Sequence, residues 1–158
     1  MRVYLDTNIL AFIVGMDKGN SINADIRAII KDYDTTLLSS NICALELLHL
    51  IQIGKISVPN NKDIRKASVA AFKVLEQIGV TFVPFNEKHI KEMIDLPLYD
   101  DHRDPNDRMV IAQSISDRIP LISSDRKFSR YERYGLDFIF LKSATIIQYT
   151  IKGRFMSR

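Results

Sequence analysis

Residues 102–125 read HRDPNDRMVIAQSISDRIPLISSD, and the fold class is most clearly indicated by this segment. Its apolar spacing predicts a helix over residues 104–118, followed at once by a short buried strand over Leu121–Ser123. Asp104 is a good N-cap for that helix, because Pro105 then occupies the first helical position, where its missing N–H costs nothing. A capped helix that runs directly into a buried strand is one step of an alternating α/β chain.

The same alternation runs through the rest of the sequence. Further strands are expected at Arg2–Leu5, 35–39, 80–84 and 137–141. Helices are expected at 9–14, from Ser21 or Asn23 to about Lys31, from Ser40 or Asn41 to near Gly54, and at 62–77, 86–94 and 143–152, with a polar loop at 96–103. No repeat or linker divides the chain, so we expect a single domain over residues 1–158, a three-layer α/β/α fold with a central parallel sheet.

Composition excludes several classes of protein. The chain has 158 residues, of which 46% are hydrophobic and 26% charged, which suits a folded domain and not a disordered one. No apolar stretch reaches membrane-spanning length, and Asp6 comes too early for a signal peptide, so we expect a cytoplasmic protein. The single cysteine, Cys43, lies in an apolar run and is interpreted as a small buried hydrophobe.

The charge is unevenly distributed along the chain. The net charge is only +3, but residues 126–158 carry eight basic and two acidic side chains, a net charge of +6, and residues 1–125 carry −3. The basic segment that begins at Arg126 contains the cations Arg126, Lys127, Arg130 and Arg133, interleaved with the aromatic residues Phe128, Tyr131 and Tyr134. This pattern fits either a solvated charged loop or a contact with the RNA backbone, in which the aromatic rings could stack on bases.

Carboxylates stand at the junctions where ligands of a parallel sheet collect. Asp6 directly follows the first strand, Asp125 follows the strand Leu121–Ser123, and Asp107 lies in the first turn of its helix. Taken singly, each has a structural explanation: Asp6 and Asp125 could cap helices or turns, and Asp107 could favour the helix dipole. In a parallel α/β fold, however, all three can converge at one edge of the sheet.

A fourth carboxylate is harder to explain structurally. Glu46 lies in a helix that is apolar on nearly all sides, and its polar exceptions, Glu46, His49 and Gln52, recur every three residues. They form either a thin stripe facing solvent or a site in which Glu46 is buried beside a cation. Several carboxylates in one pocket repel one another unless their pKa values rise or a cation is bound, and all-oxygen ligands suit Mg²⁺, Mn²⁺ or Ca²⁺.

The residues resemble the PIN domain, and most closely the VapC-type toxins of bacterial toxin–antitoxin pairs. The resemblance is carried by Leu5-Asp6-Thr7-Asn8, by Glu46 in its apolar helix, by the segment from His102 to Gln113, and by Leu121 to Asp125. Asn106 departs from the aromatic or aliphatic residue usual between Pro and Asp, and Ser124 stands where Thr is common. Neither departure removes an acidic residue.

The resemblance implies a Mg²⁺- or Mn²⁺-dependent ribonuclease. Its acidic quartet, both catalytic and metal-binding, would be Asp6, Glu46, Asp107 and Asp125, supported by Asp104, Thr7, Asn8 and Ser124. Glu46 would either complete the metal site or orient the attacking water. Toxins of this type form dimers, are inhibited by a cognate VapB-like antitoxin, and cleave structured RNA, so we expect an RNA substrate, an antitoxin partner, and a homodimer or a higher toxin–antitoxin assembly.

Other functions share some of these features. A housekeeping RNA-processing nuclease would use the same chemistry, and a degenerate PIN fold could bind RNA or protein without cleaving it, although none of the four acids is missing. A haloacid-dehalogenase-like phosphatase would need a second Asp where Asn8 stands, and a response-regulator receiver would need an acidic pair near the first strand. The metal-dependent ribonuclease is the interpretation that uses all four acids.

Overall fold

The computed structural model describes residues 1–15 and 24–142 and contains one parallel sheet of five strands. The strands are β1 (Arg2–Leu5), β2 (Thr36–Ser40), β3 (Thr81–Val83), β4 (Leu121–Ser123) and β5 (Phe138–Phe140), in the spatial order β3-β2-β1-β4-β5. The helices are α1 (Thr7–Val14), α2 (Ala24–Lys31), α3 (Asn41–Gln52), α4 (Ile64–Gln77), α5 (Glu87–Ile94) and α6 (Pro105–Asp117), and a 3₁₀ helix, η1, spans Arg126–Tyr134. The expected α/β/α fold is confirmed.

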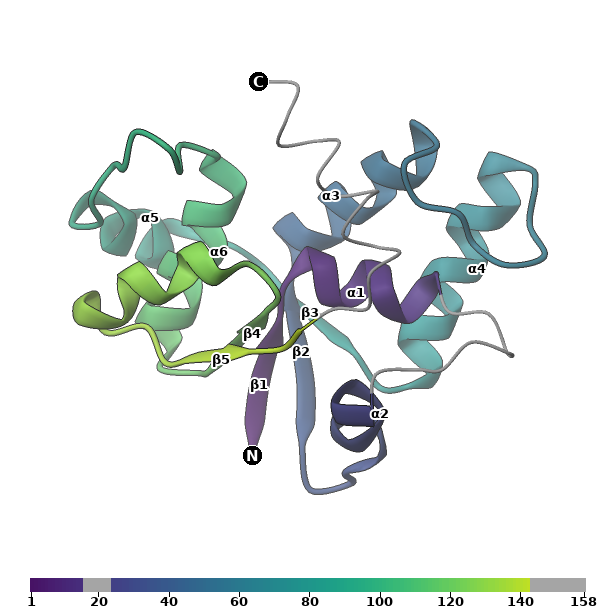
Figure 1. Ribbon diagram of the computed structural model, residues 1–158, viewed down its shortest axis with the longest axis horizontal. Coiled ribbons are helices and arrows are strands. Elements are labelled where there is room, and N and C mark those ends of the chain that lie inside the picture. The colour runs from purple at the N-terminus through teal and green to yellow at the C-terminus, as the bar shows by residue number, and fades with distance from the viewer. Residues whose placement is uncertain (16–23, 143–158) are drawn as a thin grey trace.

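The direction in which the chain adds strands to the sheet reverses once. After β1 the chain adds β2 and then β3 on one side, and it then returns across the sheet to place β4 on the other side of β1. Because crossovers between parallel strands are right-handed, connections running in opposite directions place their helices on opposite faces. Accordingly, α1, α3 and α4 lie on one side of the sheet and α5 and α6 on the other (Figure 1). The switch in direction lies between β1 and β4.

Local capping sets the start of most helices. Asp6 caps α1 by accepting from the backbone N–H of Thr7, so this helix begins two residues before the expected start. Ser40 caps α3, and Asp63 caps α4 by accepting from the N–H of Lys66, so the expected start at residue 62 moves to Ile64. Asp104 caps α6 with Pro105 in the first turn, as the sequence predicts. The remaining boundaries agree with prediction to within one or two residues.

Two expectations differ from the structure or lie outside it. A short turn was expected after Asp125, but η1 continues to Tyr134 and stops at Gly135, whose φ of 100° suits a residue without a side chain. The turn is extended because Phe128 and Tyr131 insert into the core, where both are fully buried. The expected helix over 143–152 and the expected caps Ser21 and Asn23 lie outside the described residues.

The core lies on both faces of the sheet and is built mainly from β1, α1, α3 and β4. Its fully buried side chains include Leu5, Ile9, Leu10, Leu47, Ile111, Leu121 and Ile122. Cys43 is buried among them, as expected. None of the described helices is long and apolar enough to span a lipid bilayer.

Leu47 of α3 offers a direct test of this packing. Its side chain is 0% exposed, so Leu47→Ala leaves a cavity and is expected to lower the free energy of unfolding by about 2–5 kcal/mol. Leu45 of the same helix is 64% exposed, and Leu45→Ala is expected to change it by less than about 0.5 kcal/mol. Urea denaturation of both variants measures the contrast, and equal losses would contradict this placement of α3.

Candidate functional site

The predicted site residues gather at the switch between β1 and β4. In open parallel sheets, ligands bind beyond the carboxyl ends of the strands, at the point where the strand order reverses. Asp6 directly follows β1 and Asp125 closely follows β4, while Tyr4 and Leu5 pair with Leu121 and Ile122 across the switch. The sheet register therefore brings the two acids to the same edge, although 118 positions separate them in the sequence.

Asp6 is buried and accepts three hydrogen bonds from nitrogen and oxygen donors, besides a weak contact from the Cys43 thiol at 4.0 Å. One carboxylate oxygen accepts from the backbone N–H of Thr7 at 2.8 Å. The other accepts from the amide of Asn8 at 3.0 Å and from the hydroxyl of Ser123 at 2.7 Å. Asn8 also accepts from the backbone N–H of Ser124, at 3.2 Å, so this side chain joins Asp6 to the end of β4. The supporting position that was not predicted is Ser123, whose inward direction follows from the strand's pairing and not from its own sequence.

Glu46 of α3 is also buried, and Thr7 is one of its partners. The Thr7 hydroxyl donates to one Glu46 oxygen at 3.1 Å. By contrast, His49 and Gln52 of the same helix are exposed. The alternative in which all three form a stripe facing solvent is therefore wrong for Glu46, which points inward while the other two point outward.

The N-terminal turn of α6 supplies the next group. Asp104 accepts from the backbone N–H of Asn106 at 2.9 Å, which is its capping contact. Asp107, in the same turn, is buried, and one of its oxygens lies 3.4 Å from Nε2 of His102. Neither of these two atoms has a hydrogen-bond partner of acceptable geometry. On its other side, His102 contacts the Tyr131 hydroxyl through Nδ1 at 2.8 Å.

Asp125, two residues after the end of β4, completes the group. Its backbone N–H donates to the Ser123 hydroxyl at 3.0 Å, and its side chain caps η1 by accepting from the N–H of Lys127 at 2.9 Å. The Ser123 hydroxyl thus donates to Asp6 and accepts from Asp125, linking the two acids through one atom.

Burial and repulsion between neighbouring charges raise the pKa values of Asp6 and Asp107. Burial, followed by the negative charge of Asp107, raises the pKa of Asp6 to about 7, although the hydrogen bonds from Ser123 and Thr7 oppose the shift. Burial also raises the pKa of Asp107, and the contact with His102 opposes that shift. A cation placed among these groups would reverse both shifts, because it favours the charged carboxylates.

The geometry points to one place where a cation fits. Atoms of His102, Asp107 and Asp125 lie within 4.8 Å of one another, and this is the only such group among residues 1–15 and 24–142. Nε2 of His102 and one oxygen of Asp107, two of the buried atoms without hydrogen-bond partners, belong to residues of this group, so the residues present suit a divalent ion. Two of the four predicted ligands, Asp107 and Asp125, belong to it, whereas Asp6 and Glu46 do not. His102 was not predicted as a ligand. The sequence signal that could have indicated it is its position two residues before Asp104, the N-cap of α6.

Comparison with known proteins identifies the family. The sequence pattern of the PIN domain matches residues 3–134. The chain belongs to the PIN domain family. No curated protein is similar enough in sequence to count as a match.

Several solved structures share this PIN fold. One is VapBC2 from Rickettsia felis, bound to a DNA fragment from the VapBC2 promoter. Its TM-score is 0.64 and its identity 17%, and the match covers 89% of this chain and 98% of that one. VapBC-1 from nontypeable Haemophilus influenzae has a TM-score of 0.60, 17% identity and the same coverage. VapC20 from Mycobacterium tuberculosis, described as a sarcin–ricin loop cleaving toxin, has a TM-score of 0.59, 16% identity and again the same coverage.

The basic segment of this PIN domain is only partly available to a ligand. Arg130 makes two contacts with Asp101, at 2.5 and 2.8 Å, and Lys127 donates to the Asp101 carbonyl at 2.7 Å. The Arg126 guanidinium lies over the Phe140 ring at 4.3 Å, and Arg133 is exposed.

The expected base-stacking aromatic rings are mostly in the core. Phe128 and Tyr131 are fully buried, so for these two residues the stacking expectation is wrong; only Tyr134, 40% exposed, can reach a base. They are buried because consecutive turns of η1 place both rings on its inner side, against β5 and the loop before α6. Helical spacing alone did not reveal which side of the segment faces the protein.

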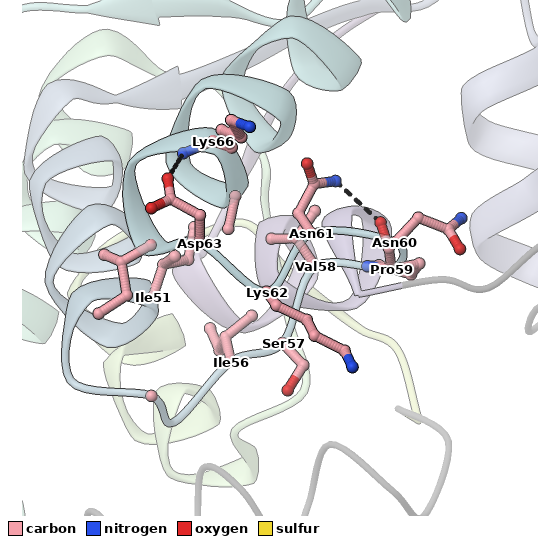
Figure 2. A pocket seen from close by; sticks show the side chains of 13 residues that line it. Ile51, Ile56, Ser57, Val58, Pro59, Asn60, Asn61, Lys62, Asp63 and Lys66 are labelled. Carbon is pink, nitrogen blue, oxygen red and sulfur yellow. Dashed lines mark hydrogen bonds between the residues drawn. The ribbon is translucent and has the colours of Figure 1, made fainter.

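A separate cleft of the PIN domain lies away from the acids. It is formed by the C-terminal end of α3, the following loop and the first turn of α4 (Figure 2). Two of its polar side chains are engaged in local structure: Asp63 accepts from the N–H of Lys66, and the Asn61 amide donates to the Pro59 carbonyl. None of the predicted catalytic acids lines this cleft.

The raised pKa values predict an unusual dependence of stability on pH in the absence of metal. An Asp whose folded-state pKa is about 7, against an ordinary 3.8, contributes stability that is complete below about pH 3.8 and is lost as the pH rises through about 7. Asp107→Asn removes one of the repelling charges. In EDTA at pH 8 this variant is expected to be about 1–3 kcal/mol more stable than the parent, a few degrees in melting temperature. The difference should shrink toward pH 5.

The control for this measurement is Asp137→Asn, because Asp137 is an exposed acid in the loop before β5. It is expected to melt like the parent at both pH values. A parent whose stability in EDTA rises steadily from pH 5 to pH 8 would contradict the raised pKa of Asp6.

Proposed function

We propose that this PIN domain is a divalent-metal-dependent endoribonuclease that hydrolyses phosphodiester bonds of RNA and serves as the toxin of a toxin–antitoxin pair. The observation that carries the proposal is the convergence of four buried or half-buried carboxylates at the switch point of a parallel sheet. Such a cluster is costly to maintain in a folded chain, and a cation with a phosphate substrate gives it a purpose. PIN domains as a family are nucleases.

The residues divide into roles that follow from their contacts. Asp107 and Asp125 would hold Mg²⁺ or Mn²⁺, and Asp6, whose oxygens already accept three hydrogen bonds, would add its charge from beside them. When bound, the ion would neutralise charge on the phosphate and lower the pKa of a coordinated water. Thr7, Asn8 and Ser124 fix the acids in place, and Asp104 starts α6 so that Asp107 faces inward.

Glu46 is best suited to the attacking water. It lies outside the group of close ligand atoms, yet it is buried and oriented by Thr7. In the hydrolysis, the water oxygen bonds to phosphorus and the bond from phosphorus to the ribose oxygen breaks. Glu46 accepts the proton that the water gives up, and the departing ribose oxygen takes a proton from solvent. This use of Glu46 gives a reason for a buried carboxylate in a largely apolar helix.

The basic segment provides a place for the RNA backbone beside these acids. It starts at the residue after Asp125, so Arg126, Lys127, Arg130 and Arg133 border the site where a phosphate must approach. Arg126 and Arg133 are the most accessible of the four. Backbone contacts of this kind position an RNA without reading its sequence.

The toxin role is supported by the fold. Two of the similar structures are VapBC assemblies, and this chain covers 98% of the matched chain in each. We therefore propose a VapB-like antitoxin as partner, a homodimer or higher assembly with it, and a cytoplasmic location, where RNA is the substrate.

The nuclease proposal is tested by removing single acids. Asp6→Asn and Asp107→Asn are expected to lower metal-dependent cleavage of total cellular RNA by about 100-fold or more, because each removes charge that stabilises the reacting phosphate. Circular dichroism should show the parent fold, and Asp137→Asn should cleave like the parent. Cleavage at the parent rate by either acid variant, or parent cleavage that survives EDTA, would contradict the proposal.

The toxin proposal is tested in cells by expressing the chain with and without the gene that neighbours it. Alone, it is expected to arrest growth and to produce discrete new 5′ ends, mapped by sequencing cellular RNA; the neighbouring gene should suppress both effects. New 5′ ends without growth arrest would indicate a housekeeping nuclease instead. The absence of both growth arrest and new 5′ ends would contradict the toxin role.

A further inference from the structure

We propose that His102 supplies a nitrogen ligand to the metal ion of this site, and that the site therefore prefers Mn²⁺ and similar transition ions to Mg²⁺. The inference rests on the proposed metal-dependent function and specifies which ion performs it. It concerns a residue outside the four acids, and it follows from the contacts of His102 on both sides of its ring.

The first side of the ring faces the site. Nε2 lies 3.4 Å from an oxygen of Asp107, and the two side chains are only 3% and 8% exposed. Neither atom has a hydrogen-bond partner of acceptable geometry, even though they are neighbours. A buried carboxylate oxygen left in this way is costly. Two such atoms side by side are what a shared cation would satisfy, and ligand atoms of His102, Asp107 and Asp125 all lie within 4.8 Å of one another.

The second side of the ring is anchored. Nδ1 lies 2.8 Å from the hydroxyl of Tyr131, which is fully buried. The ring also packs against Phe128 and Tyr131, with centroid separations of 5.6 and 5.5 Å. A histidine that binds a metal through one nitrogen usually donates the other ring N–H to an oxygen, which fixes its orientation and tautomer. Tyr131 is placed to receive that N–H.

The donor set then decides which ion is preferred. Mg²⁺ binds through oxygen and is a poor partner for imidazole, whereas imidazole is a good ligand for first-row transition ions. A group of one imidazole and two carboxylates therefore favours Mn²⁺, or Co²⁺ as a spectroscopic substitute, over Mg²⁺. An acids-only site at the same place would not show this preference.

His102 is the one histidine of this chain that can reach the acids. The sequence contains three histidines, and all three are described. His89 accepts from the N–H of Asn86 through Nδ1 and faces Asp117 through Nε2, and His49 is exposed on α3. An imidazole nitrogen found on the bound metal is thus assigned to His102 by a single substitution.

The experiment measures the ligand directly. Mn²⁺ is added to the purified full chain, and electron spin-echo modulation from ¹⁴N is recorded for the parent, His102→Gln and the surface control His49→Gln. Glutamine places an amide oxygen near the position of Nε2. We expect ¹⁴N coupling from a coordinated imidazole in the parent and in His49→Gln, and its loss in His102→Gln. The ratio of Mn²⁺ to Mg²⁺ affinity, measured by calorimetry, should fall at least about tenfold in His102→Gln.

The outcomes separate this inference from the proposed function. Mn²⁺ binding by the parent without ¹⁴N coupling would overturn the role of His102 and leave the metal-dependent nuclease standing. Equal affinity ratios in the parent and a folded His102→Gln would also overturn it, showing that Nε2 only positions Asp107. If the parent binds neither ion, the inference and the proposed function both fail. If His102→Gln does not fold, ¹⁴N coupling that persists in His49→Gln still assigns the ligand to His102, because His89 is held by Asn86 and Asp117.

Discussion

The site depends on one hydrogen bond, from the Ser123 hydroxyl to Asp6 at 2.7 Å. It joins the end of β4 to the end of β1, two strands that are neighbours only because the chain reverses its direction across the sheet after β3. The same hydroxyl accepts from the backbone N–H of Asp125, so one side chain contacts both the Asp6 carboxylate and the backbone of Asp125. Asp107 and Glu46 reach this point from helices on opposite sides of the sheet.

This clustering of buried acids lowers the stability of the fold and suits the binding of a cation. Burial and the neighbouring charges raise the pKa values of Asp6 and Asp107, so the fold must supply donors and a large core to hold them. Thr7, Asn8 and Ser123 supply those donors to Asp6, while one oxygen of Asp107 and Nε2 of His102 receive none of acceptable geometry. Because the oxygens of Asp6 have hydrogen-bond donors and one oxygen of Asp107 has none, a ligand is expected beside Asp107 and not beside Asp6.

Much of this could be predicted from the sequence, for reasons that are local. The strand before Asp6 and the capped helix after Asp104 follow from short-range patterns, and so do the strand Leu121–Ser123 and the acid that follows it. Observed helix boundaries differ from the predicted ones by one or two residues, as at α4, where Asp63 is the N-cap and the helix starts at Ile64. The segment after Asp125 was predicted poorly, because its alternation of cations and aromatic rings does not reveal which side faces the core. Phe128 and Tyr131 turned inward, and Asp101 engaged Arg130.

The alternating α/β pattern, the family, and the acids after strands and at the start of a helix can be predicted from residues close together in the chain. The packing of the folded chain is needed to tell which of those acids lie close enough to share a cation. It brings His102 to Asp107 and Asp125, while Asp6 and Glu46 lie outside that group. Distances between side chains on different elements are set by strand order and packing, which involve residues more than 100 positions apart.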